Sequence, residues 1–211
     1  MKKQLMIAVL ALSTLLSAPA SVTSYNGSAY TIADGNPNGT FSQIVVSGEN
    51  ASLTSLTVSL NISGGYNGDL YGYLSYNGTL ITLVNQVGSG AYADAGFNIT
   101  LADSGALGAI QTYQTVQNPN GGTVTGTWTA ADGSLNTAFQ GLNPNGTWTL
   151  FFADMSGGGG TSTINGWSLN ITAVPEPANV ALCVFGGMAA LFGGIRWRLE
   201  KRRRSSLQNW P

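Results

Sequence analysis

The chain has 211 residues, of which 43% are hydrophobic and only 8% are charged, against about 25% charged in typical soluble proteins. All eight basic residues lie near the two ends, since no Lys or Arg occurs between Gln4 and Ile195. The stretch 21–173 therefore has seven acidic residues and no cation, which excludes nucleic-acid binding because nothing there neutralises phosphates. His is absent throughout, so Ser-His and Cys-His nucleophilic sites are excluded as well.

Residues 1–20 have the three parts of a secretory signal. Two lysines precede an apolar run over 5–16, and Ala18 and Ala20 stand at the two small-residue positions that signal peptidase recognises. Cleavage after Ala20 is favoured, because cleavage after Ala18 would leave Pro19 just past the cut bond. The alternative is an uncleaved anchor helix, for which the run is short. We therefore expect signal peptidase to release an exported chain.

Residues 21–173 are expected to form one all-β domain, because apolar and polar residues alternate there at period two. The clearest alternating segments are 56–62, 97–101, 148–152 and 167–171. Each can bury one face and expose the other, as the strands of a sandwich do. Pairs such as Asn77-Gly78 and Asn165-Gly166 indicate turns, and Asn-Pro-Asn-Gly, present three times, is interpreted as a reused turn. The segment 104–125 has little periodicity and is expected to be irregular.

Three motifs follow one another in this domain: Asn-Gly-Asp-Leu at 67–70, Asn-Gly-Thr-Trp-Thr-Leu at 145–150 and Gly-Trp-Ser-Leu at 166–169. In this order they resemble the P domain found beside subtilisin-like proprotein convertases. The resemblance implies a jelly-roll antiparallel β-sandwich of about eight strands. Two departures limit it to the fold: no protease domain precedes the motifs, and the His that the family often carries before Gly-Asp-Leu is missing from Gly-Gly-Tyr at 64–66.

The carboxylates of this domain offer one metal hypothesis. Asp69, Asp103 and Asp154 each lie beside a turn, and carboxylate oxygens suit calcium, whereas zinc would lack His and Cys ligands within 21–173. Similarity to P domains also implies that calcium can bind in such loops. The alternative is that these residues cap turns. A glycosidase would need a defined carboxyl pair, and no pair stands out, so we expect no enzyme.

Four tyrosines gather in the segment 66–76, and two of them suggest a ligand. Tyr71 and Tyr73 alternate with Leu70 and Leu74, so they are expected on the outward face of a strand. Exposed aromatic rings stack on sugars, which makes Tyr71 and Tyr73 candidate contacts for exopolysaccharide. The alternative is an aromatic pair that only stabilises the sheet.

The last part of the chain has three components in sequence: a Val-Pro-Glu-Pro tetrapeptide, an uncharged apolar run over 181–195 and a basic cluster. The tetrapeptide is Val174, Pro175, Glu176 and Pro177, and the basic residues are Arg196, Arg198, Lys201, Arg202, Arg203 and Arg204. At ~1.5 Å per residue the run covers roughly 23 Å of a hydrocarbon core ~30 Å thick, a marginal single transmembrane helix. The basic cluster is expected on the cytoplasmic side, with residues 205–211 as a cytoplasmic tail.

Taken over 174–204, these components resemble the PEP-CTERM sorting signal, which implies cleavage by an exosortase-type membrane protease in a bacterium that makes exopolysaccharide. The alternative is an ordinary tail anchor with a proline linker. We therefore predict an exported cell-envelope or extracellular-matrix protein, held at least transiently in the inner membrane and then placed at the cell surface or outside. Its β domain would be structural or adhesive. A carbohydrate-binding module for exopolysaccharide is the second hypothesis, and a secreted glycosidase is the third.

Overall fold

The structure is a computed structural model that describes residues 20–49, 51–88, 94–175 and 177–208. It divides into two compact units, one of residues 20–174 and one that contains helix α3 (Pro177–Gln208). The predicted signal lies outside the described residues, except Ala20, which is exposed just before the first strand.

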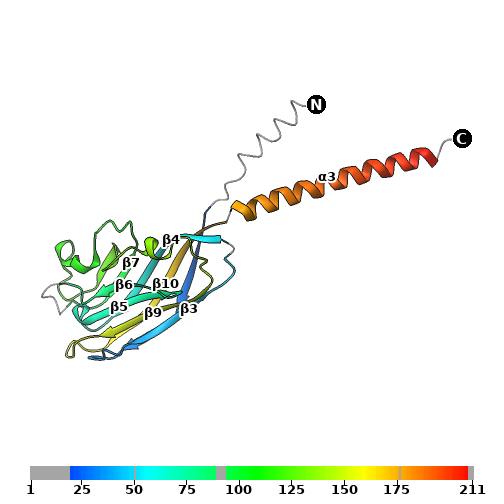
Figure 1. Ribbon diagram of the computed structural model, residues 1–211. Helices are drawn as coiled ribbons and strands as arrows, with labels where there is room; N and C mark the ends of the chain where they lie inside the picture. Colours follow the sequence, from blue (N-terminus) through cyan, green and yellow to red (C-terminus); the bar gives the residue numbers. More distant parts are fainter. Residues whose placement is uncertain (1–19, 50, 89–93, 176, 209–211) are drawn as a thin grey trace. The chain divides into compact units, whose positions relative to one another are not determined.

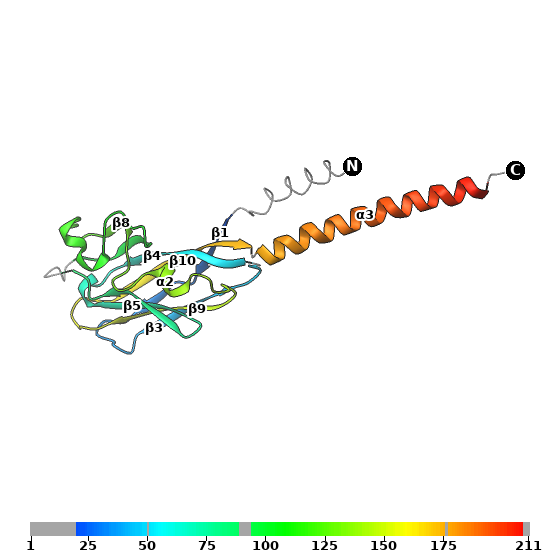
Figure 2. The same cartoon turned by 45° about the horizontal axis from the view of Figure 1, so that its top comes forward.

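Ten strands in the described residues form two sheets (Figures 1 and 2). The larger sheet contains β1 (Ser21–Gly27), β2 (Tyr30–Ile32), β4 (Ala51–Ser63), β7 (Phe97–Leu101), β8 (Val124–Trp128) and β10 (Ser162–Pro175). The smaller sheet contains β3 (Thr40–Val46), β5 (Leu70–Tyr76), β6 (Thr79–Asn85) and β9 (Gly146–Asp154). Three short helices lie in the connections between strands: η1 (Asn67–Asp69), η2 (Ile110–Thr115) and α2 (Leu135–Phe139). The predicted mostly-β, two-sheet architecture is confirmed.

The strand order is β1–β10–β4–β7–β8 in the larger sheet, with β2 beside β10, and β3–β9–β5–β6 in the smaller sheet. Every pairing in the smaller sheet is antiparallel. In the larger sheet, β7 and β8 run parallel, which departs from the purely antiparallel sandwich that was predicted. The reason is the connection over 102–123, because its length and its helix η2 return the chain to the same end before β8 begins.

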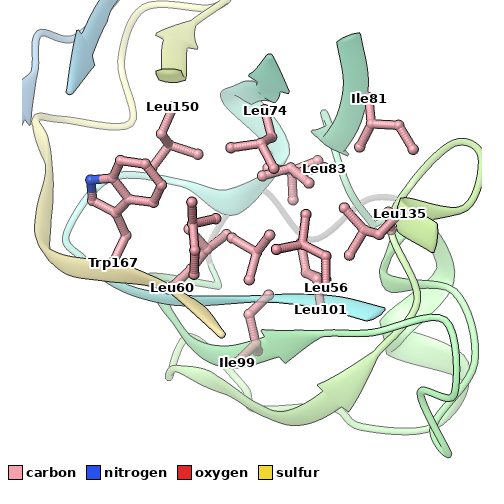
Figure 3. Packing of buried hydrophobic residues seen from close by; sticks show 14 of the residues in the cluster. Leu56, Leu60, Leu74, Ile81, Leu83, Ile99, Leu101, Leu135, Leu150 and Trp167 are labelled. Carbon is pink, nitrogen blue, oxygen red and sulfur yellow. The ribbon is translucent and has the colours of Figure 1, made fainter. Parts of the chain in front are cut away.

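The core lies between the two sheets. The inward residues of all four predicted alternating segments are at most 3% exposed. Figure 3 shows Leu56 and Leu60 of the larger sheet pointing toward Leu74 and Leu83 of the smaller sheet. Each fully buried side chain of this size contributes about 1.5–3 kcal/mol relative to an exposed one. The period-two pattern thus predicted correctly which face of each strand is buried.

The repeated tetrapeptide Asn-Pro-Asn-Gly forms the same turn three times. In each copy the Oδ1 of the first Asn accepts a hydrogen bond of 3.0 to 3.3 Å from the N–H of the third residue. The first residues are Asn36, Asn118 and Asn143. The closing glycine has a positive φ in every copy, which residues with a Cβ rarely adopt. The interpretation as a reused turn is confirmed.

The predicted turn at Asn165-Gly166 is wrong, because both residues lie inside β10. The Asn165 side chain does not bend the local backbone. Its Nδ2 instead donates across to the side chains of Asn61 and Ser63 on β4, at 3.1 and 3.0 Å. Cross-strand side-chain pairing therefore overrides the local turn preference of the dipeptide.

Helix α3 carries the basic cluster. The Nε of Arg196 lies 3.5 Å from the Oε1 of Glu200 one turn later, and the Lys201 ammonium lies 5.4 Å from the centre of the Trp197 ring. In the described residues, no helix has a stretch long and apolar enough to span a membrane. The side chains of 181–184, at the start of the predicted span, lie outside the description, as do those of Arg202 and Arg203.

Candidate binding faces and a coupled carboxylate pair

Strand β5 places the two candidate tyrosines on the outer face of the smaller sheet. Leu70 and Leu74 are fully buried, whereas Tyr71 and Tyr73 are half-buried on the opposite face, as the alternation predicts. Their rings meet edge to face, with centroids 6.2 Å apart. The two tyrosines therefore pack against each other and still present part of their surface to solvent.

Two phenylalanines extend this surface across the sheet. Tyr73 lies directly opposite Phe151 on β9, and Phe151 lies opposite Phe41 on β3. The rings of Tyr73 and Phe151 stack at 4.7 Å, and Phe41 is 60% exposed. We call Phe41, Phe151, Tyr73 and Tyr71 the aromatic row.

Sequence reasoning missed both phenylalanines of the aromatic row. Phe41 and Phe151 stand at the outward positions of alternating strands, which is a visible signal. Their alignment with Tyr73 depends on β9 pairing with both β3 and β5. No local sequence pattern indicates such pairing between distant segments. A row of rings with exposed edges and faces can stack on flat apolar surfaces, including the apolar faces of sugar rings.

The outer face of the larger sheet is different in chemistry. Its cross-strand pairs are amides and hydroxyls: Asn26 faces Ser168, and Asn61 faces Asn98. These side chains border a shallow groove of about 260 Å³, which we call the polar groove. Its lining residues are Asn26, Gly27, Ser59, Leu60, Asn61, Asn98, Gly166, Trp167 and Ser168. None of them is charged.

Two of the three predicted calcium ligands lie close together. Asp154, at the end of β9, lies opposite Leu70, the residue that follows Asp69. Burial raises the pKa of Asp69, and the nearby carboxylates of Asp154 and Asp34 raise it further. Asp154 is fully buried; its Oδ1 accepts from the Ser156 N–H at 3.1 Å, while its Oδ2 has no partner among the described residues. Sequence reasoning had not included Asp34 in this group.

Asp103 does not join that pair, which corrects the predicted three-residue calcium site. Its carboxylate accepts hydrogen bonds from the Ser134 hydroxyl at 2.6 Å and from the N–H groups of Leu135 and Asn136 at 2.8 and 2.9 Å. The N–H groups of Leu135 and Asn136 have no partner within the first turn of α2, so Asp103 caps that helix together with Ser134. Within the described ranges, no three Asp, Glu, His or Cys residues gather so that they could hold a metal ion.

Other carboxylates also anchor loops. Asp34 accepts from the N–H groups of Gly158 and Gly160 at 3.1 and 3.3 Å, and Asp94 accepts from the N–H of Gly121 at 2.8 Å. The turn-capping alternative therefore describes Asp103, Asp34 and Asp94, and also the Oδ1 of Asp154, which accepts from the Ser156 N–H. It does not explain why Asp154 and Asp69 are buried close together.

The residues predicted to take part in processing lie next to, or within, segments that the structure does not describe. Val174 and Pro175 end β10, Pro177 begins α3, and Glu176 between them lies outside the described residues. Ala18 lies outside as well. Arg196, Arg198, Lys201 and Arg204 are exposed on α3.

No model of a known protein family matches the sequence, and no curated protein matches it. Among solved structures, the fold is similar to a serine protease of Aeromonas sobria in complex with its chaperone, with 14% identity and a TM-score of 0.44. That match covers 79% of this chain and 29% of the other. FlhE matches with 9% identity and a TM-score of 0.43, over 74% of this chain and 98% of the other. The VP2 subviral particle of infectious bursal disease virus matches with 12% identity and a TM-score of 0.37, over 79% and 35%.

Proposed function

We propose that this chain is an exported cell-envelope or extracellular-matrix protein that an exosortase-type membrane protease sorts and cleaves, and whose β domain has an adhesive role. The observation that carries the proposal is the distribution of charge and motif along the chain. Residues 21–173 contain no cation, and the Pro-Glu-Pro segment separates them from an apolar run and a basic end. Basic residues are retained on the cytoplasmic side of membranes, whereas a cation-free domain has no such signal.

The element boundaries support a processing site at Pro-Glu-Pro. Strand β10 ends at Pro175 and α3 begins at Pro177, so the tripeptide is the junction between a β unit and a helix. A proline disfavours helical backbone in the residue before it and is well placed at the first position of a helix. The two prolines therefore favour an extended residue before each of them and a helix start at Pro177. We propose that the apolar run of 181–195 enters the inner membrane at least transiently, while the protease cuts at this junction.

For the finer fold we propose a jelly roll of the P-domain type. Its support is that both motif tryptophans point into the core: Trp148 on β9 is 0% exposed and Trp167 on β10 is 3% exposed. Trp148 also stacks on Tyr76 at 4.0 Å, which ties β9 to β5. The parallel pair β7–β8 is the part of the larger sheet that departs from a purely antiparallel roll.

A second candidate function, binding of exopolysaccharide, is favoured by the aromatic row. The row crosses three neighbouring strands, and Phe41 is 60% exposed at one end of it. Gln43 and Thr149 lie beside it and bond to each other at 3.2 Å, which gives the rings polar neighbours for sugar hydroxyls. The buried pair Asp69 and Asp154 does not support a glycosidase, because a sugar cannot reach either carboxyl.

Sorting is tested by expressing the chain, with a C-terminal epitope tag, in a bacterium that has an exosortase-type enzyme and in one that lacks it. We expect the tag to be removed only in the first host. The variant P175A/E176A/P177A should keep the tag there, because the Pro-Glu-Pro motif is removed. The variant S205A/S206A, altered outside the proposed signal, should be cut like the wild type. Retention of the tag by the wild-type chain in the first host would refute the proposal.

Adhesion is tested on a glycan array with the full chain and the double variant Y71A/Y73A. We expect the variant to lose binding to the polysaccharides that the wild-type chain retains, because two rings of the row are removed. The control V22A shortens an exposed side chain on β1 of the other sheet and should bind normally. Equal binding by Y71A/Y73A and V22A would show that the aromatic row does not bind these polysaccharides.

A further inference from the structure

The polar groove lies across four neighbouring strands of the larger sheet. Strands β1, β10, β4 and β7 contribute in that order, and their outward side chains at the groove are Asn or Ser. The volume of about 260 Å³ is slightly below the usual range for small-molecule pockets, which starts near 300 Å³. A ligand of about one sugar ring is the size that such a groove accepts.

Glycines and one buried tryptophan make the hollow. A Cβ on Gly27 would lie 2.0 Å from the Nε1 of Trp167, so the indole ring occupies the place of a side chain there. The same Nε1 donates to the Ser42 hydroxyl at 3.0 Å, which fixes the ring. A Cβ on Gly166, by contrast, would meet no atom within 4 Å, so this glycine opens directly onto free space.

Three of the five polar side chains that line the groove are not used by the fold, whereas the Ser59 hydroxyl pairs with that of Thr100 at 3.2 Å. The side chains of Asn26, Asn98 and Ser168 make no hydrogen bond to any group in the described part of the chain. Asn61 uses only its Oδ1, which accepts from Asn165 at 3.1 Å, so its amide N–H groups remain available. Three Asn side chains from three strands thus offer donors and acceptors to the same space.

The chemistry of the lining selects the class of ligand. Each Asn amide offers a donor and an acceptor, and each sugar hydroxyl is also both, so neighbouring hydroxyls can pair with one amide. An anion would find no Lys or Arg, since none occurs between Gln4 and Ile195, and a metal cation would find no carboxylate in the lining. The groove is therefore suited to a neutral, hydroxyl-rich ligand.

We propose that the polar groove is a binding site for one neutral sugar residue of a glycan, held by the side chains of Asn26, Asn61 and Asn98. This inference shares the ligand class of the proposed adhesive role, but it uses another sheet and other residues. Variants of the groove and the variant Y71A/Y73A therefore test two separate sites. Either proposed site can be refuted while the other is supported.

The sharpest test fills the groove without touching the core. In G166F, the new side chain enters open space, and Gly166 has no positive φ to strain. The matched control S24F places the same ring on an exposed position of β1, on the same face but outside the groove. The full chain, purified in mild detergent, is screened against uncharged oligosaccharides, with anionic alginate oligosaccharides for comparison, and hits are measured by calorimetry.

We expect the wild-type chain to bind at least one neutral glycan and not the anionic ones. G166F should weaken that binding about tenfold or more, and S24F should leave it within about twofold. The second variant, N26A/N98A, removes two amides from exposed positions, so it tests the groove even if G166F misfolds. Circular dichroism checks that both variants are folded. Failure of the wild-type chain to bind any neutral glycan, or wild-type affinity in both groove variants, would overturn the proposal.

Discussion

The outer faces of the two sheets share a backbone pattern and differ in what they present. The smaller sheet presents the aromatic row, in which Phe41, Phe151 and Tyr73 align across three strands. The larger sheet presents amides and hydroxyls, with Asn61 opposite Asn98 as an example. Alternation at period two determines which residues are buried, and it leaves the outward positions free to vary. The chemical difference between the two outer faces therefore lies in outward side chains, which the core does not determine.

The two faces also suit different parts of one ligand class. Rings offer flat apolar area, whereas amides offer directional hydrogen bonds. A polysaccharide has both apolar ring faces and hydroxyl edges. A domain with one face of each kind is consistent with an adhesive protein that contacts glycans on two sides.

The largest stability effect is expected at Gly27 of the larger sheet. The change Gly27→Val places a side chain where the Trp167 ring lies and should destabilise the fold by about 1–3 kcal/mol or more, as overpacking does. The matched change Gly166→Val enters open space and should stay within about 0.5 kcal/mol of the wild type. Urea unfolding of the full chain measures both. Equal losses would mean that Trp167 does not shape the groove.

The next effect is expected in the aromatic row. Tyr73→Ala removes a ring stacked at 4.7 Å on Phe151 and should cost about 0.5–1.5 kcal/mol beyond the lost buried area. Ser168→Ala, on the polar face, removes a hydroxyl without a described partner and should change the unfolding free energy by less than about 0.5 kcal/mol. The same urea titration compares them. If the two variants were equally stable, the row would have no structural role.

In the acid range a pH response is expected from Asp69, which lies just before β5 of the smaller sheet, whereas no titratable group lines the polar groove. The folded chain raises the pKa of Asp69 above its usual value of 3.8, first by burial and then through Asp154 and Asp34. The folded state thus holds a proton that the unfolded state has lost. Stability should fall as the pH rises from 3.8 through the raised pKa, and stay lower above it.

The change Asp69→Asn removes that titration. The variant should therefore lose less stability than the wild type between pH 3 and pH 7, as followed by thermal unfolding at each pH. Ser168→Ala, which removes no titratable group, is the control and should keep the wild-type pH profile. A parallel profile for D69N and the wild type would contradict the assigned coupling.

The smallest effect on stability is expected at Phe41, which is 60% exposed. Phe41→Ala should change the unfolding free energy by less than about 0.5 kcal/mol, yet it should shorten retention on a hydrophobic-interaction column, because it removes exposed apolar area. Val22→Ala, at a similarly exposed site on the larger sheet, should shorten retention less. Unchanged retention in F41A would show that the row is not accessible.

The sequence was sufficient to predict the buried faces and several turns. Leu56 to Ile62 alternates clearly, and each Asn-Pro-Asn-Gly closes the same local turn, so both follow from neighbouring residues alone. The aromatic row and the polar groove did not follow, because they depend on which strands pair. The mistaken grouping of Asp103 with Asp69 and Asp154 has the same origin, since the helix that Asp103 caps begins about thirty residues later, at Leu135.

The central claim, that the β domain is exported and separated from its basic end, is tested most directly by mass spectrometry of both termini of the protein isolated from its own cells. The account predicts an N-terminus at Ser21 and a C-terminus at or near the Pro175–Pro177 junction, without the arginines of the basic cluster. An intact chain from Met1 to Pro211 would contradict it.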